Sequence, residues 1–544
     1  MKAEGRKSTF LPVWLALGTG FLLFLSFPGA AGFWPLAWVA LVPLLLAIRN
    51  ASPGRAARLG LLAGMVHYVS LLYWITIVLG RYGNLPLWVS VPALLLLALY
   101  MSSYLVLFCV LMSRVWKQKE ILVVWIGPLL WVGLDFIRSF LFSGFPWQDL
   151  AYSQYKALLL IQTADLTGHF GITFNIVLVN TVTALLLVLW RDNRAVGKSS
   201  LAVLMTLRIR QAWFYAVLPS FCIMLAIMTY NILRYGQISE LIDSSPKMKI
   251  AVVQGNIEQD QKWSPAMRLE TIEIYTKLSE LAMAQGEGST PLLVWPETAL
   301  PFLISENPYF NEMKKQLTSK RKSWLLTGAP FIKKVEANNP EQVKKEILSY
   351  NSAYLLTPDG EIGGRYDKQH LVPFGEYIPL SNYLPLPGPL VENIGNFSRG
   401  ESARPLSCQS AEIGVLICFE SIFPKLARDW TAAGANLLVN ITNDAWFGRS
   451  SAPWQHLSMT VFRALENRRS LARSANTGVS AIIDPLGRMV DTTPLFQPAF
   501  LVADAPLLQK KTIFVSFGYY FGLLCLLVCI PFAFVFRNAK KDRI

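Results

Sequence analysis

The chain has 544 residues, of which 53% are apolar and only 16% are charged, whereas soluble domains carry roughly 25% charged residues. This composition, with 6 cysteines in the whole chain, excludes a disulfide-rich secreted scaffold, a collagen-like chain and a disordered one. It indicates a membrane protein.

The net charge of +15 raises the question of a nucleic-acid partner. Basic and acidic residues each number 28 between residues 239 and 511, so the remainder of the chain holds 22 basic and 7 acidic residues. A nucleic-acid-binding protein concentrates Lys and Arg on a folded domain. Because the surplus here lies beside hydrophobic runs, we expect no nucleic-acid partner.

Uncharged runs predict eight transmembrane helices, since about 20 apolar residues cross the hydrocarbon core. They lie at residues 8–47 (two helices, broken at 27–32), 59–80, 82–113, 121–134, 166–190, 212–233 and 513–536. The short run 121–134 is closed by Asp135 and Arg138. His67 and Asp165 lie inside or at the edge of these runs, where ionisable groups are costly and often functional. We expect both to be helix-packing or interfacial residues, with a functional role as the alternative.

The basic residues predict the orientation. Taken alternately from the N-terminus, one set of loops and ends holds 18 Lys and Arg, and the other short loops hold only Arg81, Arg138 and Lys156. Because Lys and Arg accumulate on the cytoplasmic side, both termini are expected in the cytoplasm and the block after the seventh helix outside. A signal peptide cleaved near residues 29–31 is the alternative for the N-terminus, but a run of span length follows at once.

Three regions follow from these patterns: a seven-helix membrane domain (1–238), an external domain (239–511), and an eighth helix with a cytoplasmic tail (512–544). In the external block, short β-rich runs alternate with helical stretches, which is typical of an α/β domain. We expect strands at 249–254, 292–295, 324–328, 352–357, 413–418, 436–441 and 480–484. Helices are expected at 266–284, 308–319, 424–433 and 455–469.

Three strand ends in this block carry reactive side chains. An apolar strand leads through Pro296 to Glu297, whose carboxylate is a candidate general base. Lys368 stands in a polar stretch and could offer a cation to a developing oxyanion. The strand at 413–418 ends at Cys418 ahead of a helix, whose N-terminal dipole would favour the thiolate.

Each of these residues has a plain structural alternative: a salt-bridge partner, a surface lysine and an inert buried cysteine. His370 is a second candidate base, although a lone histidine more often satisfies a local hydrogen bond. A disulfide between Cys408 and Cys418 is not expected, because a short hairpin through residues 409–412 would leave them out of register. The remaining four cysteines fall in the predicted spans.

Glu, Lys and Cys at successive strand ends, in that order, resemble the nitrilase superfamily, whose fold is a four-layer α-β-β-α sandwich. The resemblance covers about residues 248–505 and implies catalytic roles for Glu297, Lys368 and Cys418.

Over its whole length the chain resembles the membrane-embedded branch of that superfamily, the apolipoprotein N-acyltransferases, which have eight spans and a periplasmic nitrilase-like domain. The motifs that carry this resemblance are Gly255-Asn256 with Lys262-Trp263, Trp295-Pro296-Glu297-Thr298-Ala299, Tyr366-Asp367-Lys368, Pro373-Phe374-Gly375-Glu376-Tyr377, Asn443-Asp444-Ala445-Trp446-Phe447-Gly448 and Ala472–Gly478. It implies supporting or substrate-binding roles for Trp263, Glu376, Phe419, Glu420 and Trp446. Phe419 stands where a tyrosine is common, which puts any role of a phenolic hydroxyl there in doubt.

The resemblance implies an acyltransferase of the bacterial inner membrane with its catalytic domain on the periplasmic side. Cys418 would take an acyl chain from a phospholipid, presumed to be phosphatidylethanolamine, and pass it to the α-amine of an apolipoprotein's diacylglyceryl-cysteine. Glu297 would move the protons and Lys368 would stabilise the oxyanion. The uncharged segments 378–391 and 445–448 are expected to be arms at the lipid interface, or alternatively buried crossing loops.

We expect no metal site, because four separate histidines and unpaired cysteines give no ligand spacing, and no cofactor, because no P-loop pattern is present. A monomer is expected. Two other functions remain open: a membrane-tethered amidase in which water resolves the thioester, and an eight-span transporter or sensor whose external domain only binds a ligand.

Overall fold

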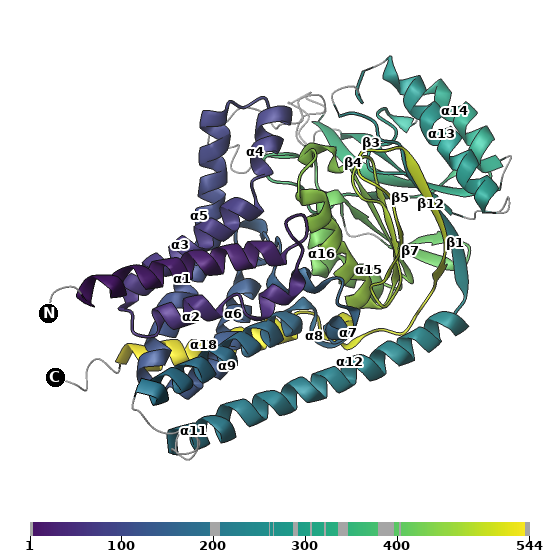
Figure 1. The fold of residues 1–544 in the computed structure, drawn as a ribbon. Helices are drawn as coiled ribbons and strands as arrows, with labels where there is room; N and C mark the ends of the chain where they lie inside the picture. The colour runs from purple at the N-terminus through teal and green to yellow at the C-terminus, as the bar shows by residue number, and fades with distance from the viewer. Residues whose placement is uncertain are drawn as a thin grey trace. The chain divides into compact units, whose positions relative to one another are not determined.

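The computed structural model describes residues 4–195, 207–259, 262–264, 266–286, 292–304, 307–319, 322–335, 346–378, 397–401 and 404–538. The chain divides into two compact units (Figure 1). The helical unit comprises Met1–Thr76, Pro86–Gly236 and Phe517–Ile544. The α/β unit comprises Ile77–Leu85 and Gln237–Ser516, so it takes a short segment from the region that the sequence assigns to the membrane domain.

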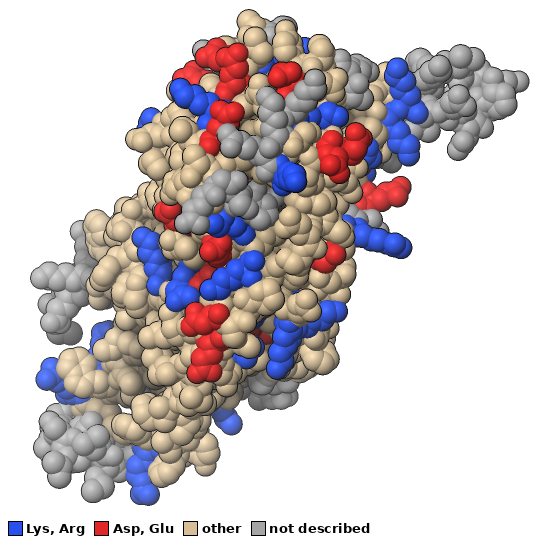
Figure 2. All heavy atoms as spheres, turned by 90° about the vertical axis from the view of Figure 1, so that its right-hand side faces the viewer, with Lys and Arg blue, Asp and Glu red and all other residues tan. Residues whose placement is uncertain are grey.

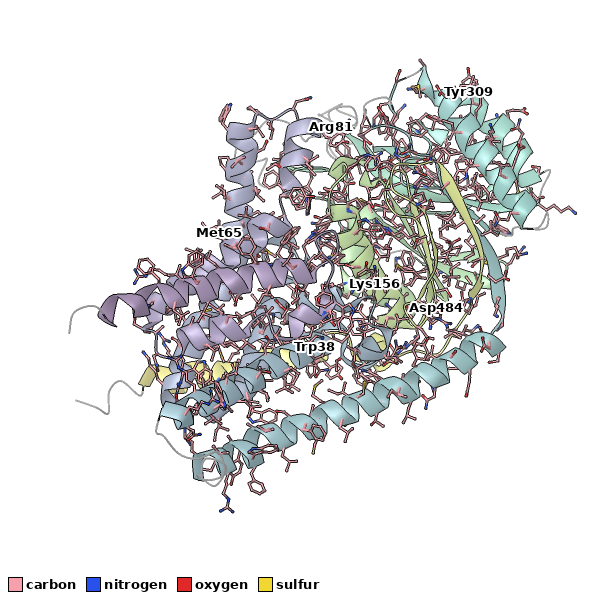
Figure 3. The ribbon with its side chains drawn as sticks, viewed as in Figure 1. Trp38, Met65, Arg81, Lys156, Tyr309 and Asp484 are labelled. Atoms are coloured by element: carbon pink, nitrogen blue, oxygen red, sulfur yellow. The ribbon has the colours of Figure 1, made fainter. Side chains whose placement is uncertain are left out.

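The helical unit is built from apolar helices with short connections. Its longer helices are α1 (Glu4–Ser26), α2 (Val42–Ile48), α3 (Pro53–Leu71), α5 (Leu87–Gln118), α6 (Val123–Arg138), α9 (His169–Ala195), α12 (Leu218–Ser244, which runs on into the other unit) and α18 (Tyr520–Asn538). Shorter turns are η1 (Trp34–Trp38), η3 (Glu120–Leu122), η4 (Leu141–Ser143), η5 (Leu150–Gln154), α7 (Leu158–Ile161), α8 (Ala164–Thr167), α11 (Leu207–Ala212) and η6 (Trp213–Val217). Trp38, labelled in Figure 3, donates from Nε1 to Oε1 of Gln154 (3.0 Å) and ties η1 to η5.

Among the described residues, 4 helices are long and apolar enough to cross a membrane: Leu87–Gln118, Glu120–Arg138, His169–Arg194 and Arg208–Ser244. A fifth span is possible if the pair Pro53–Leu71 and Ile75–Tyr82, bent by 53°, counts as one. The predicted number of eight is therefore not confirmed. The long run at 8–47 breaks into shorter helices because Pro35 and Pro43 each occupy a first helical turn, where proline is favoured.

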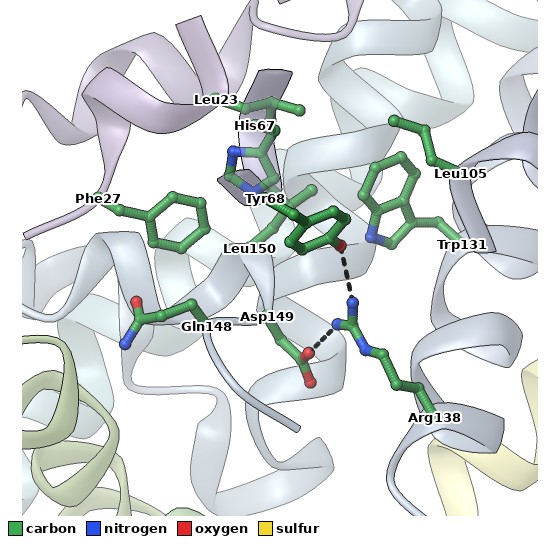
Figure 4. Close-up of a pocket in the computed structure, with 10 residues that line it drawn as sticks. All are labelled: Leu23, Phe27, His67, Tyr68, Leu105, Trp131, Arg138, Gln148, Asp149 and Leu150. Atoms are coloured by element: carbon green, nitrogen blue, oxygen red, sulfur yellow. Dashed lines mark hydrogen bonds and ion pairs between the residues drawn. The ribbon is translucent and has the colours of Figure 1, made fainter. Parts of the chain in front are cut away.

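One cluster of buried ionisable groups in the helical unit is paired around Arg138, and Figure 4 shows two of its contacts. Arg138 donates to the Tyr68 hydroxyl (2.8 Å) and pairs with Asp135 (2.8 Å) and Asp149. His169 lies 2.9 Å from Asp149. Because a buried charge is tolerated when it is paired, helix α6 continues to Arg138 instead of ending before Asp135.

The two ionisable residues that the sequence analysis assigned to packing also have neighbours in this unit. Asp165 accepts from Arg234 (2.7 Å) and from the Tyr230 hydroxyl (2.9 Å). The ring of His67 lies 5.6 Å from that of Phe27 and is buried. These contacts agree with the packing interpretation.

The α/β unit contains two six-stranded mixed sheets. The first has the order β12-β1-β2-β3-β4-β5, and the second β11-β10-β9-β8-β7-β6. The strands are β1 (Lys247–Gln254), β2 (Leu292–Val294), β3 (Trp324–Val335), β4 (Glu346–Leu356), β5 (Ile362–Asp367), β6 (Leu406–Cys408), β7 (Ala411–Ile417), β8 (Leu437–Thr442), β9 (Ser470–Ala475), β10 (Ala481–Ile483), β11 (Met489–Thr492) and β12 (Ala499–Pro506). Strands β1, β2 and β3 run parallel, as do β7, β8 and β9.

Helices cover the outer face of each sheet and the inner faces pack together. The helices and turns of this unit are η2 (Val78–Tyr82), which continues from α4 (Ile75–Ile77) at the boundary with the helical unit, α13 (Met267–Gln285), α14 (Pro308–Lys314) with η8 (Lys315–Ser319), η9 (Cys418–Ile422), α15 (Pro424–Ala432), η10 (Asp444–Phe447), α16 (Ala452–Asn467) and α17 (Ile513–Phe517). Helix α13 packs on β1 and β12, whereas α15 packs on β7 and α16 on β9. Between the sheets, Ser474 of β9 donates to the Val253 carbonyl of β1 (2.9 Å). The four layers are α-β-β-α, as predicted.

The apolar strands were predicted well and the polar ones were not. Strands β7 and β8 are almost wholly buried and read as continuous apolar runs, which is typical of parallel strands covered on both faces. The sequence analysis missed β5, β6, β9, β11 and β12 and placed the start of β4 too late. Strand β9 contains Arg473, and a charged residue argues against a buried strand in the sequence. In the structure Arg473 is buried because it pairs with Asp444 (2.7 Å).

One face of the molecule carries mixed charge (Figure 2). On the face drawn in Figure 2, basic and acidic side chains are interspersed among the residues shown in colour. This distribution agrees with the equal numbers of acidic and basic residues between 239 and 511.

Candidate active site

The candidate residues lie just beyond strand ends of the α/β unit. Glu297 follows β2, Lys368 follows β5 and Cys418 follows β7. In each sheet the parallel strands end at one common edge, so residues that follow them gather there. The structure brings Glu297, Lys368 and Cys418 into electrostatic contact with one another.

Glu297 is held by both of its carboxylate oxygens. Oε2 accepts a hydrogen bond from the main-chain N–H of Asn443 (2.9 Å), and Oε1 accepts from Nδ2 of Asn351 (2.7 Å). The ammonium of Lys368 lies 3.8 Å from Oε1. Because the carboxylate is buried and its donors come from two different sheets, its orientation is fixed before any substrate binds.

Lys368 is a buried ammonium with a carboxylate on either side. Its Nζ donates to Oε1 of Glu376 (2.8 Å), and the other oxygen of Glu376 accepts from the N–H of Val372 (2.8 Å). Burial alone would lower the pKa of Lys368, but Glu376 and Glu297 outweigh it and hold this pKa above its usual value. Lys368 is therefore a fixed cation, suited to stabilise negative charge on a substrate oxygen.

Cys418 occupies a sharp turn between β7 and the short helix η9. Its φ of +53° lies in the left-handed region, which is uncommon for a residue with a side chain and is often found at functional sites. The turn lets the side chain leave the end of the sheet, and Cys418 is half-buried whereas the strand before it is buried.

Glu420 holds this turn in place. Its Oε2 accepts from the N–H of Ile417 (2.8 Å). Its Oε1 accepts from the Tyr366 hydroxyl (2.8 Å) and from the N–H groups of Gln369 (2.7 Å) and His370 (3.0 Å). The carboxylate of Glu420 thus joins the Cys418 turn to the loop that carries Lys368.

The expectation of a resting thiolate is wrong. Burial, and then Glu297, raise the pKa of the Cys418 thiol, and Lys368 lowers it by less. A 3-10 turn, not an α-helix, begins at Cys418, and α15 starts only at Pro424, so the expected helix dipole is not there. The thiol is protonated at neutral pH and needs a base, for which Glu297 is the neighbouring carboxylate.

Lys262 is a second buried lysine that sequence reasoning treated only as part of a motif. Its Nζ donates to the main-chain oxygen of Glu297 (3.0 Å), and it interacts electrostatically with Cys418. Burial lowers the pKa of Lys262 to about 8. From the sequence alone Lys262 would be taken for a surface residue, because its neighbours in the chain do not indicate that it is fully buried.

Three further predicted site residues are aromatic, and two of them contact other aromatic rings. Trp263 is half-buried. The ring of Trp446 lies 5.5 Å from that of Tyr82, and the ring of Phe419 lies 5.2 Å from that of Phe423.

His370 joins the site through its main chain and not through its ring. The ring lies 3.8 Å from that of Phe423. Burial, with Arg399 and Lys368, lowers the pKa of His370 to about 4, so the imidazole is neutral near pH 7.

Of the predicted interfacial arms, residues 379–391 lie outside the described residues, and residues 445–448 follow β8 in and after the turn η10. Cys408 and Cys418 are both free. Within the described ranges no group of three or more His, Cys, Asp and Glu is placed to hold a metal ion.

Two family models match the chain, one in each part. Residues 19–182 match the apolipoprotein N-acyltransferase N-terminal domain, and residues 249–509 match carbon-nitrogen hydrolase. A curated apolipoprotein N-acyltransferase of Geobacter metallireducens is 43% identical over 94% of this chain and 92% of its own. The chain belongs to the apolipoprotein N-acyltransferase family.

A second apolipoprotein N-acyltransferase, from Chlorobaculum tepidum, is 31% identical over 93% of this chain and 92% of its own. Among solved structures, a carbon-nitrogen hydrolase of Helicobacter pylori aligns with 48% of this chain and 89% of its own, at 20% identity and a TM-score of 0.35. The likeness to apolipoprotein N-acyltransferases thus extends over both units.

Proposed function

We propose that this protein transfers an acyl chain from a membrane phospholipid to the α-amine of the diacylglyceryl-cysteine of an apolipoprotein. The relatives named apolipoprotein N-acyltransferase, similar over more than nine tenths of the chain, support this activity. The observation that carries the proposal is the grouping of a thiol, a carboxylate and a buried ammonium at Cys418, Glu297 and Lys368.

In the first step the enzyme is acylated. Glu297 accepts the proton of the Cys418 thiol as the sulfur attacks the ester carbonyl of the phospholipid, and the carbonyl oxygen becomes an oxyanion that Lys368 stabilises. The intermediate collapses, and the C–O bond of the ester breaks. Glu297 returns the proton to the departing alkoxide, so that a lysophospholipid leaves and a thioester remains on Cys418.

In the second step the acyl chain moves to the amine. The α-amine of the lipid-modified cysteine attacks the thioester carbonyl, and the oxyanion again faces Lys368. As the C–S bond breaks, Glu297 takes the surplus proton of the amine and passes it to the sulfur. The products are an N-acyl amide and the original thiol.

The apolar helices support a donor within the bilayer. Exposing an acyl chain to water costs about 0.8 kcal/mol per CH₂, so a nucleophile that reacts at the lipid surface avoids most of this penalty. We assign the α/β unit to the periplasmic side of the inner membrane and both termini to the cytoplasm. We further propose eight spans, a phosphatidylethanolamine donor and a monomeric enzyme.

The remaining predicted residues take supporting roles in this proposal. Glu376 positions Lys368, and Glu420 positions the Cys418 turn. The aromatic side chains of Trp263, Phe419 and Trp446 contact the acyl chain. Phe419 needs no hydroxyl for this role, because it acts by apolar contact.

The test is to incubate the purified protein with phosphatidylethanolamine alone and then to add a diacylated lipopeptide. Mass spectrometry is expected to find a fatty acyl adduct on Cys418 in the first stage, and its transfer to the peptide amine in the second. The Cys418→Ala variant is expected to form neither. Free fatty acid without N-acylated peptide would show that water, and not the amine, resolves the thioester, and would favour the hydrolase alternative. Transfer by Cys418→Ala would contradict the proposal outright.

A further inference from the structure

A buried polar network lies behind the Cys418 turn. His456 of α16 contacts the turn from this side: its Nε2 lies 3.2 Å from the main-chain oxygen of Cys418 and 2.8 Å from Oγ of Ser421. Its Nδ1 lies 3.1 Å from Oδ1 of Asp444 and 3.1 Å from Nη2 of Arg473. His456, Asp444 and Arg473 are each at most 1% exposed, so His456 meets the main chain of the nucleophile from inside the protein.

The charged groups that face His456 keep its ring neutral. Burial, and then the guanidinium of Arg473, lower the pKa of His456. Asp444 is ionised, because the guanidinium of Arg473 outweighs its burial and helps to lower its pKa to about 2. The donors to Asp444 are Arg473 (2.7 Å) and the Thr442 hydroxyl (2.9 Å), so its carboxylate does not need a proton from His456.

The contacts of the ring indicate which nitrogen carries the proton. Nδ1 lies next to a donor, Arg473, and an acceptor, Asp444. The first favours an unprotonated Nδ1 and the second a protonated one, so the neighbours of Nδ1 do not decide where the proton is. At Nε2 it meets the carbonyl oxygen of Cys418, which can only accept, and the hydroxyl of Ser421, which can do either. The proton therefore belongs on Nε2, from which it is donated to the Cys418 carbonyl and to Ser421.

Holding this carbonyl fixes the N–H of the next residue. The peptide group between Cys418 and Phe419 is planar and trans, so its C=O and N–H point in opposite directions. With the oxygen of Cys418 bound to His456, the N–H of Phe419 points away from the buried network. A main-chain N–H directly after a nucleophile is well placed to donate to the oxyanion that forms on the substrate.

We propose that His456 is a positioning residue that orients the Cys418–Phe419 peptide, so that the Phe419 N–H stabilises the oxyanion together with Lys368. His456 does not touch the substrate or the sulfur. This role rests on the proposed acyl transfer at Cys418. It predicts that the rate of Cys418 acylation depends on His456, whereas the rate of Cys418 alkylation does not.

The experiment compares two amides at this position in the full-length protein. The side-chain NH₂ of His456→Gln falls near the former Nε2 and can still donate to the Cys418 carbonyl, whereas that of His456→Asn falls near Nδ1 and cannot reach it. Two rates are measured for each: acyl adduct formation on Cys418 from phosphatidylethanolamine, and alkylation of Cys418 by iodoacetamide, which forms no oxyanion. Ser458→Ala, a change on the same helix at a side chain that donates to the Gln455 carbonyl (2.7 Å), is the control.

We expect His456→Asn to acylate about 10- to 100-fold more slowly than the wild type, which is less than the roughly 100- to 1000-fold found when an oxyanion donor is removed, because the Phe419 N–H is misaligned and not lost. Its alkylation rate should change less than about twofold, and His456→Gln should recover most of the acylation rate. Equal acylation by both variants, or a parallel loss of acylation and alkylation, would overturn the proposal, as would failure of both variants to fold. Absence of the adduct in the wild type would instead refute the proposed function.

Discussion

Lys368 owes its charge to Glu376, the residue in contact with its ammonium (2.8 Å). With its folded pKa raised above the unfolded value, near 10.4 for a free lysine, the charge stabilises the fold below the unfolded pKa. That contribution is lost only as pH rises through the folded pKa. Glu376 therefore keeps the cation available at every pH at which the protein works.

Glu376→Gln removes the largest influence that opposes burial, so the pKa of Lys368 should fall. We expect adduct formation on Cys418 to drop roughly 10- to 100-fold at neutral pH and the alkaline limb of the pH–rate profile to move to lower pH. Pre-steady-state mass spectrometry between pH 6 and 10 measures both effects. Glu361→Gln, at an exposed carboxylate, should leave the profile unchanged, and an unshifted alkaline limb in Glu376→Gln would contradict this account of Lys368.

Single residues also mark where sequence reasoning ends. Glu297 and Cys418 follow strands that were predicted, whereas strand β5 before Lys368 was missed, so Lys368 was singled out by its local polar stretch and by the order Glu, Lys and Cys. Lys262 and His456 could not be found that way, because their importance lies in contacts with main-chain oxygens of residues 35 and 38 positions away. Periodicity and composition carry no information about such distant pairs.

At the scale of elements, the turn between β7 and η9 depends on the carboxylate of Glu420, which accepts from four groups. In Glu420→Gln one oxygen becomes an NH₂ group that cannot accept, so at least one buried donor loses its partner at a cost of about 1–3 kcal/mol. We expect a lower melting temperature and slower adduct formation on Cys418. Glu412→Gln, on β7 where the carboxylate meets the exposed Ser407 hydroxyl (3.0 Å), should change neither; a wild-type melting temperature for Glu420→Gln would refute the role given to this carboxylate.

The elements that could be predicted are those with a clear local pattern. Strand β8 is a continuous apolar run, and the buried residues of helix α15 recur at helical spacing. Strand β12 could not be predicted, since its pairing with β1 joins Ala499–Pro506 to Lys247–Gln254, and antiparallel partners so far apart leave no local signature. Whether the first long apolar run makes one helix or several depends on where proline falls within a helical turn.

At the scale of the whole molecule, the basic residues predict the orientation in the membrane. In a background of Cys222→Ser and Cys418→Ala, we expect Ser410→Cys to react with a membrane-impermeant maleimide added to intact spheroplasts. Ser52→Cys should react only after the membrane is opened. Both positions are exposed, so accessibility within the fold does not limit the reaction. The opposite labelling pattern would contradict the proposed topology.

The α/β unit is discontinuous in the chain. Residues 77–85 group with residues 237–516; Tyr82 contacts Trp446, and a side chain at Gly448 would press on Ile77 (3.2 Å). A fragment cut out at the boundaries of the polar block would leave this segment behind and uncover the aromatic ring next to the turn after β8. Truncation alone would therefore give a fragment with a newly exposed aromatic surface, and a water-soluble version of this unit would need that surface redesigned or the segment 77–85 grafted back.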